Sequence, residues 1–216
     1  RYYEIDKKNE GYYQNLISRR YTFCNNEKDD FIIIDKECVL GFNSENEKKE
    51  WVQEIILEQN NLVNKFRSSS FKLPKDIKAQ YGEIDFLGLN WNGDIIIMEL
   101  KQNAPQKTYL SPIQVGYYHR QFSKLLKEDD GTLYDNICKM INQKIEFGLI
   151  KLPKGKTLPK RLSGKLKSYV IVGDDIFSNE VIRRYQAAKS VFLPDMEAYS
   201  CMNDGTLKHS ILDNII

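Results

Sequence analysis

Hydrophobic residues recur with changing periods along the 216-residue chain, and each change of period predicts a new element. Residues 1–43 hold short runs of aromatic and β-branched residues between charged turns, which predicts a small β-rich N-terminal segment. From Ser44 onward apolar positions follow helical spacing, so we expect Ser44 to cap a helix that ends near residues 67–70. A loop that contains Pro74 should follow this helix.

The most apolar stretch, residues 82–103, has the pattern of a β-hairpin. Its turn is Asn92-Gly93, a pair that readily supplies the positive φ angles of a tight turn. Residues 95–98 read Ile-Ile-Ile-Met and are apolar at every position. A strand that is apolar on both faces should lie in the centre of a sheet.

Helical and strand-like patterns alternate in the second half of the chain. Ser111-Pro112 predicts the start of a helix that continues to Lys127, because proline is favoured at the first helical position. A second helix is expected over 133–147, with Gly148 as its stop. Further along we expect a strand over 168–172, a helix over 179–189 and two strands joined at 203–205. This alternation predicts an α/β fold, a mixed central sheet flanked by helices.

Composition limits the possible classes of protein. With 41% hydrophobic residues the chain can bury a core of its own, and we expect residues 44–216 to form one domain that carries segment 1–43 as an extension. The formal net charge is only +2, so a nucleic-acid surface must be local. Residues 151–167 hold seven basic residues and no acidic one, which predicts an exposed loop that contacts phosphates. A merely solubilising loop is the alternative.

The cysteines and the lack of long apolar runs indicate a cellular location. Cys24, Cys38, Cys138 and Cys201 lie far apart without a C-x-x-C pair, so we expect reduced, mostly buried thiols. No apolar run approaches the roughly 18 residues that span a bilayer. The first four residues do not form a secretory signal. We therefore expect a cytoplasmic protein without a membrane partner.

The hairpin carries the residues with the clearest chemistry. Asp85 lies on its first strand, and Glu99 and Lys101 share one face of its second strand because side chains alternate. If these faces meet, two carboxylates, an ammonium and the Leu100 carbonyl converge. Asp85, Glu99 and that carbonyl offer the oxygen ligands that Mg²⁺ prefers, and Lys101 can orient water or neutralise phosphate charge. This layout predicts a metal-dependent phosphodiesterase site. The alternative is an exposed strand end with alternating charges.

This arrangement resembles the PD-(D/E)XK nucleases, the restriction-endonuclease-like superfamily. The sequence Gly-Glu-Ile-Asp ends at Asp85. The sequence Glu-Leu-Lys begins at Glu99, fourteen residues after Asp85, and ends at Lys101. The resemblance covers residues 45–125 and implies that Asp85 and Glu99 bind the metal and that Lys101 is the catalytic lysine. It departs from the motif at the nominal proline, where Ile84 stands.

Two more features are similar to the RecB-type branch of this superfamily. Gln114 and Tyr118 match a Q-x-x-x-Y element and would share one helix face, where they would meet DNA or support the metal cluster. Alternatively, Tyr118 only packs against its neighbours. The superfamily also adds one Glu from the helix before the hairpin. Glu50, Glu54 and Glu58 are candidates, and Glu54 is preferred because it borders the apolar stripe.

The resemblance therefore implies a deoxyribonuclease that uses Mg²⁺ or Mn²⁺ and acts in DNA repair, recombination, restriction or phage defence. DNA is the expected partner, and a homodimer is one possible assembly. Two other classes stay open. One is a nucleic-acid-binding or assembly module with a nuclease-like fold and no turnover, and the other is a surface-interaction domain that makes contact through segment 1–43.

Overall fold

The computed structural model describes residues 8–67, 77, 81–102 and 104–214. Its strands form one mixed sheet. The strands are β1 (Phe31–Cys38), β2 (Ile84–Asn90), β3 (Ile95–Lys101), β4 (Leu166–Val172), β5 (Glu197–Cys201) and β6 (Leu207–His209). They lie side by side in the order β1-β2-β3-β4-β5-β6. The pairs β1–β2, β2–β3 and β5–β6 are antiparallel, whereas β3–β4 and β4–β5 are parallel.

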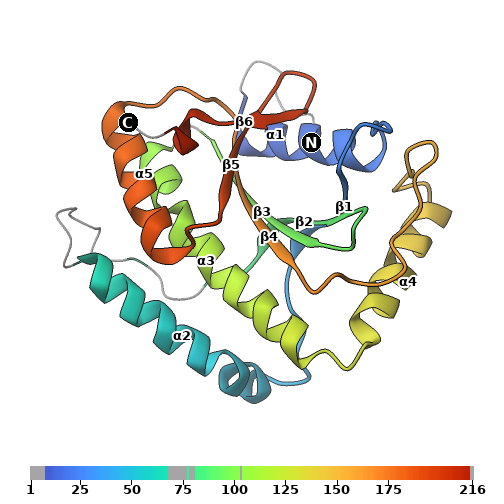
Figure 1. The fold of residues 1–216 in the computed structure, drawn as a ribbon, viewed down its shortest axis with the longest axis horizontal. Coiled ribbons are helices and arrows are strands. Elements are labelled where there is room, and N and C mark those ends of the chain that lie inside the picture. Colours follow the sequence, from blue (N-terminus) through green and yellow to red (C-terminus); the bar gives the residue numbers. More distant parts are fainter. Residues whose placement is uncertain (1–7, 68–76, 78–80, 103, 215–216) are drawn as a thin grey trace.

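Helices cover both faces of this sheet (Figure 1). They are α1 (Glu10–Thr22), α2 (Glu45–Arg67), α3 (Pro105–Glu128), α4 (Thr132–Glu146) and α5 (Asn179–Phe192), and a short 3-10 turn, η1, covers Ile211–Asp213. Helix α1 packs on one face, α3, α4 and α5 pack on the other, and α2 lies outside α3 and α5. The predicted α/β class, with a mixed sheet between helices, is confirmed.

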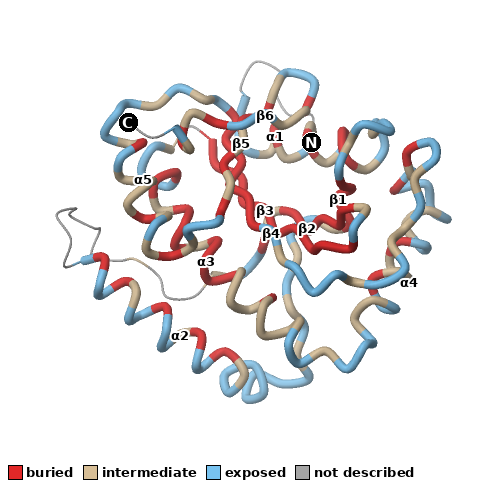
Figure 2. Tube along the Cα trace, viewed as in Figure 1, coloured by how far each residue is buried: buried red, intermediate tan, exposed pale blue. Residues whose placement is uncertain are grey.

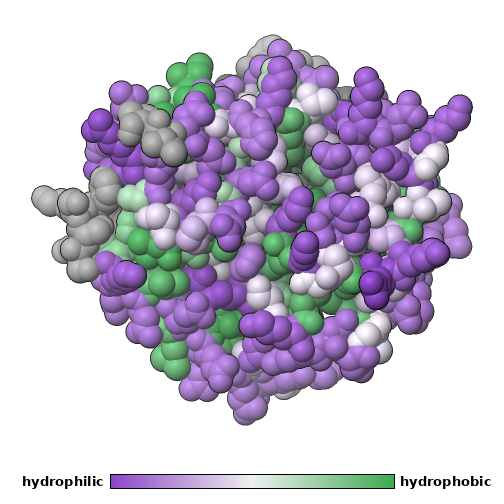
Figure 3. Space-filling model, viewed as in Figure 1, coloured by the Kyte–Doolittle hydropathy of each residue, from purple (hydrophilic) through white to green (hydrophobic). Residues whose placement is uncertain are grey.

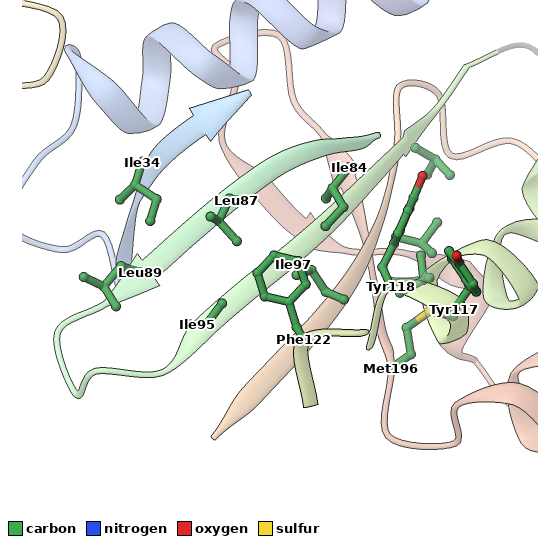
Figure 4. Packing of buried hydrophobic residues seen from close by; sticks show 14 of the residues in the cluster. Ile34, Ile84, Leu87, Leu89, Ile95, Ile97, Tyr117, Tyr118, Phe122 and Met196 are labelled. Carbon is green, nitrogen blue, oxygen red and sulfur yellow. The ribbon is translucent and has the colours of Figure 1, made fainter. Parts of the chain in front are cut away.

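A hydrophobic layer lies on each face of the sheet, so the strands are the most buried part of the chain (Figure 2). On the α1 face Ile96 clusters with Tyr13, and on the opposite face Ile97 clusters with Phe122 (Figure 4). All seven residues of β3 are buried, which confirms the prediction of a central strand. The face of the molecule seen in Figure 3 is mainly hydrophilic. Across the described ranges, no helix is both long and apolar enough to cross a bilayer.

The N-terminal segment differs from its prediction. Residues 10–22 form helix α1, because Tyr13, Ile17 and Tyr21 are four apart and are all buried on one helix face. Strand β1 does form, but it pairs with β2 inside the central sheet and is no separate extension. The rings of Tyr13, Tyr21 and Phe31 belong to the core, so these three are not available for the contact that was left open as an alternative for segment 1–43.

Helix α2 begins and ends close to the predicted positions. The Ser44 hydroxyl accepts a hydrogen bond from the backbone N–H of Glu47 at 3.2 Å, which is the expected N-cap. The helix ends at Arg67, and the loop with Pro74 lies outside the described residues.

The hairpin between β2 and β3 is confirmed, but its turn uses one positive φ angle instead of two. Gly93 has a φ of 88°, and Asn92 does not share that conformation. The Asn90 side-chain oxygen accepts the N–H groups of Asn92 at 3.0 Å and Asp94 at 2.8 Å, so a side chain closes the turn. A Cβ atom on Gly93 would lie 2.3 Å from the Arg161 carbonyl oxygen, which explains why glycine is needed there.

The predicted start of α3 is wrong. The helix begins at Pro105, and Pro112 lies in its interior. A proline has no N–H for the carbonyl four residues earlier, which here belongs to Thr108. The Ser111 hydroxyl donates to that carbonyl at 2.6 Å and replaces the missing partner, so Ser111-Pro112 is accommodated inside the helix.

The remaining elements agree with the predictions within a few residues. Helix α4, helix α5 and the β5–β6 hairpin lie where the pattern predicted them, and β4 begins at Leu166.

All four cysteines are free, yet Cys201 alone is buried, Cys24 is exposed, and Cys38 and Cys138 are half-buried. The expectation of mostly buried thiols is therefore wrong, although Cys38 still packs against the core with part of its surface.

Candidate active site

Glu99 and Lys101 end the central strand β3 as buried charged residues. Glu99 is 2% exposed and Lys101 is 8% exposed. The Lys101 ammonium donates to Glu99 Oε1. Among the residues that the structure describes, the other oxygen, Glu99 Oε2, is buried without a hydrogen-bond partner. A buried carboxylate oxygen without a partner is costly, so this atom is suited to a ligand that the protein itself does not supply.

Asp85 lies beside this pair at the start of β2. Its Oδ2 atom accepts a hydrogen bond from the backbone N–H of Leu100 at 2.6 Å. The N–H and carbonyl of one strand residue point to the same neighbouring strand, so the Leu100 carbonyl faces the side on which Asp85 lies. The structure therefore brings together Asp85, Glu99 and Leu100, as the sequence predicted.

Burial raises the proton affinity of both carboxyls. It raises the pKa of Asp85 to about 6, although the Leu100 hydrogen bond and the Lys101 charge act in the opposite direction. It raises the pKa of Glu99 to about 8, where the Lys101 charge lowers the value and the Asp85 charge raises it. The two carboxyls are thus close enough to influence each other, and each is poised to ionise when a cation compensates the lost hydration.

Glu10, the first residue of α1, is a third acid near this site. Its charge contributes to the raised pKa of both Asp85 and Glu99. The sequence prediction missed it because residues 1–43 were interpreted as β-rich. Asn9 gives the signal that was overlooked, since its side chain accepts the N–H of Tyr12 at 2.9 Å and caps the helix directly before Glu10.

Gln114 and Tyr118 share one face of α3, as their spacing predicted. The Gln114 amide donates to the Tyr118 hydroxyl at 3.2 Å, and that hydroxyl donates to the Glu83 carbonyl. Tyr118 thereby fixes the backbone two residues before Asp85, and its ring extends from α3 towards that strand (Figure 4). The ring is also 2% exposed, so Tyr118 is both a core residue and a support for the site. Burial is the main cause that raises the pKa of the Tyr118 hydroxyl, and the charge of Glu99 is the second cause.

Glu54 is not brought to the site. The buried stripe of α2 faces α3 and α5, and α3 lies between α2 and the sheet (Figure 1). Glu54 is exposed and lines a hollow together with Arg120 and Lys124. Glu58 also lines that hollow, 3.5 Å from the Arg120 guanidinium, and Glu50 is exposed. The expectation failed because it assumed that the helix preceding the hairpin packs beside it.

The basic loop lies at the other end of β3. The Ser163 N–H donates to the Gly93 carbonyl at 2.9 Å, and the Ser163 hydroxyl donates to Asp94 at 2.5 Å. These bonds tie residues 151–167 to the turn of the β2–β3 hairpin. The six steps from Ile95 to Lys101 span about 20 Å at 3.3 Å per residue. The loop is therefore docked away from the acidic site.

The residues at the site fit a hard divalent cation with few protein ligands. Within the ranges that the structure describes, no group of three or more His, Cys, Asp or Glu side chains is arranged to hold a metal ion. Mg²⁺, however, is commonly bound through one or two carboxylates and keeps several waters. Asp85, Glu99 and the Leu100 carbonyl supply such a set, and the unpartnered Glu99 oxygen gives it an open position.

Comparisons with protein-family models, with curated proteins and with solved structures give no match for this chain. The arguments about its chemistry therefore rest on its own residues. The strongest of these are the neighbouring carboxyls of Asp85 and Glu99 and the ammonium of Lys101.

Proposed function

We propose that the chain is a metal-dependent deoxyribonuclease of the PD-(D/E)XK type, with a restriction-endonuclease-like fold, that hydrolyses phosphodiester bonds in DNA. Repair, recombination, restriction and phage defence are the processes that require such an activity. The observation that carries the proposal is the buried Glu99 carboxylate, which has Lys101 on one oxygen and no partner for the other within the described part of the chain.

Each residue of the site has a proposed task. Asp85, Glu99 and the Leu100 carbonyl would hold Mg²⁺ or Mn²⁺. When bound, such a cation lowers the pKa of a coordinated water and neutralises charge on phosphate oxygens. Lys101 orients the attacking water or stabilises the charge that develops on phosphorus. Tyr118 and Gln114 hold the start of β2, so they position Asp85.

Glu10 replaces Glu54 as the proposed acid from a helix. Its charge contributes to the raised pKa of both carboxyls that would bind the metal, and Glu10 is exposed at the first turn of α1.

Incubation with DNA tests this proposal directly. Labelled linear, circular and branched DNA would be incubated with and without Mn²⁺, and cleavage is expected only with the metal. Asp85→Ala, Glu99→Ala and Lys101→Ala should each abolish cleavage and leave the circular-dichroism spectrum unchanged. Glu50→Ala is the matched control, since Glu50 is exposed on α2. Cleavage by Glu99→Ala at the wild-type rate would reject the mechanism.

A second candidate function is a nucleic-acid-binding or assembly module without turnover. The pairing of Lys101 with Glu99 favours it, because the buried charges already compensate each other in part. Calorimetric titration with MnCl₂ separates the two candidates. Metal binding that is lost in Asp85→Ala supports the nuclease, whereas no binding by the wild-type chain supports the module.

A cytoplasmic location and a homodimer are also parts of the proposal. The exposed Cys24 and the free state of all four thiols suit a reducing compartment. Sedimentation with and without DNA would establish whether the active species is a dimer.

A further inference from the structure

A hollow of about 570 Å³ lies at the end of the sheet opposite the candidate active site. Its walls come from the β2–β3 turn, the segment between α1 and β1, the start of β4 and the β5–β6 hairpin, elements that Figure 1 labels. Ile96 of β3 lines it, five residues before Lys101. These five steps correspond to about 17 Å, and Ile96 packs with the α1 face of the sheet. The hollow, named here the aromatic pocket, is thus separate from the acidic site.

Aromatic rings form one wall of the aromatic pocket. Tyr169 and Tyr199 pack edge to face with their centroids 4.8 Å apart, and His209 stacks behind Tyr199 at 4.8 Å. Trp91 faces the same hollow, and its indole N–H donates to the Asp29 carbonyl at 2.6 Å. Because neighbours hold these rings in place, a flat ligand can stack on Trp91 or Tyr199 without a large loss of side-chain freedom.

Lysines surround this wall. Lys28, Lys156 and Lys167 all line the aromatic pocket, and the Lys156 ammonium lies 5.5 Å from the centroid of the Trp91 ring. An ammonium on a flexible stem is a good point-charge partner for phosphate. Lys28 and Lys167 are exposed, so they can turn towards a bound anion.

The acids of the aromatic pocket do not cancel this positive charge. Asp29 is already paired with the Arg20 guanidinium through contacts of 2.5 and 2.6 Å. Asp30 and Glu197 remain as carboxylates on the lining, against three lysines. Glu197 accepts the Tyr199 hydroxyl at 2.7 Å and can accept an exocyclic amine as well, since a carboxylate has several acceptor sites.

We infer that the aromatic pocket binds a nucleotide. The base stacks on Trp91, with Tyr199 in the wall beside it, and the phosphate lies between Lys156 and Lys167. Stacking combined with cations is how proteins bind unpaired nucleotides without reading a sequence. The same chemistry suits a free mononucleotide and an unpaired nucleotide of a strand. This inference does not depend on the proposed nuclease activity.

Tryptophan fluorescence tests the inference. The chain has two tryptophans, so the Trp51→Phe variant reports on Trp91 alone. This variant would be titrated in EDTA with deoxyadenosine monophosphate, with a short single-stranded oligonucleotide, with deoxyadenosine and with inorganic phosphate. We expect saturable quenching by the first two and affinity at least about tenfold weaker for the nucleoside and for phosphate, which lack one of the two contacts. An oligonucleotide that binds more tightly than the mononucleotide identifies a strand as the ligand, and equal affinities identify a free nucleotide.

Matched variants decide where the nucleotide binds. Lys167→Ala and Tyr199→Leu should each weaken binding by about tenfold. Lys154→Ala is the control, because Lys154 is exposed in the same loop but does not line the aromatic pocket. Asp85→Ala should bind as the parent does, so loss of cleavage and loss of nucleotide binding are distinguishable. No saturable quenching by either nucleotide, equal binding of phosphate, or equal effects of Lys154→Ala and Lys167→Ala would overturn the inference.

Discussion

Leu100 donates its backbone N–H to the Asp85 carboxylate at 2.6 Å, so the acid of β2 is fixed to the residue between Glu99 and Lys101. An asparagine at position 85 keeps an oxygen that can accept this bond but loses the charge. Asp85→Asn should therefore fold normally and cleave DNA at least about a hundredfold more slowly. Thermal unfolding and single-turnover cleavage would check these two expectations. A variant that is unfolded, or one that is fully active, would contradict them.

Stability should depend on pH through the same carboxyls. The pKa of Asp85 is raised from 3.8 to about 6 and that of Glu99 from 4.5 to about 8, so the folded chain binds more protons than the unfolded chain between these values. The contribution of the pair to the free energy of unfolding therefore falls as the pH rises from about 4 to about 8. Denaturation by urea across this range measures the effect, and Asp85→Asn should flatten its lower part.

Magnesium should restore the stability that the fold loses as the pH rises. A cation binds the ionised carboxylates of the folded chain and does not bind the unfolded chain. Because more of these carboxyls are ionised at pH 8 than at pH 6, MgCl₂ should raise the melting temperature more at pH 8. Scanning calorimetry with MgCl₂ or with NaCl of equal ionic strength measures the difference. Equal shifts with the two salts at both pH values would argue against a metal site at Asp85 and Glu99.

Lys101 should stabilise the fold only while Glu99 is ionised. Lys101→Met leaves a buried carboxylate without its cation, which costs about 3 kcal/mol of unfolding free energy at a pH above the Glu99 pKa. At pH 5 Glu99 is protonated, and the loss should be much smaller. The double variant Glu99→Gln/Lys101→Met removes both charges and serves as the control, expected to regain most of the stability at high pH. Equal losses at both pH values would show that Lys101 acts through packing.

The hairpin part of the site could be predicted because it is local in sequence. Asn92-Gly93 fixes the turn, and side-chain alternation in two adjoining strands then determines that Asp85 and Glu99 meet. Gln114 and Tyr118 were predictable for the same reason, since helical spacing places them on one face. Their attachment to the Glu83 carbonyl, however, emerged only from the packing of α3 against β2.

The contributions of α1 and α2 could not be predicted in this way. The charge of Glu10 acts on Asp85 although the two residues are far apart in sequence, and no local pattern encodes this relation. Glu54 had the expected residue type and helical position, but the apolar stripe of α2 turned it away from the strands. The start of α3 was misjudged because the Ser111 hydroxyl compensates for Pro112, an effect that depends on the Thr108 carbonyl.

Replacing Glu10 or Glu54 by glutamine tests whether the helical acid of the site comes from α1 or from α2. Glu10→Gln should weaken metal binding and lower the pKa of Asp85 and Glu99, because it removes a negative charge that raises both. Glu54→Gln should change neither property. Calorimetric titration with MnCl₂ and the pH dependence of metal affinity would measure them. If Glu54→Gln has the larger effect, the assignment of the helical acid to α1 is wrong.

Gly173 supports the strand end that carries Lys101. Its N–H donates to the Lys101 carbonyl at 3.1 Å, and a Cβ atom there would lie 1.9 Å from Gln102 Oε1 and 2.5 Å from the Tyr13 ring. The same Gln102 donates to Asp174 at 2.6 Å. Gly173→Ala must displace these side chains, so it should cost about 1–3 kcal/mol of unfolding free energy.

The displacement should also reach the active site, because Gln102 directly follows Lys101. We expect Gly173→Ala to cleave more slowly even where it is fully folded, and urea denaturation with cleavage assays at low temperature would separate the two effects. Gly41→Ala is the control, since a Cβ atom there meets nothing within 4 Å and its backbone has no positive φ. Equal stabilities of the two variants would mean that the space around Gly173 adapts without strain, and the link between Gln102 and the position of Lys101 would then be wrong.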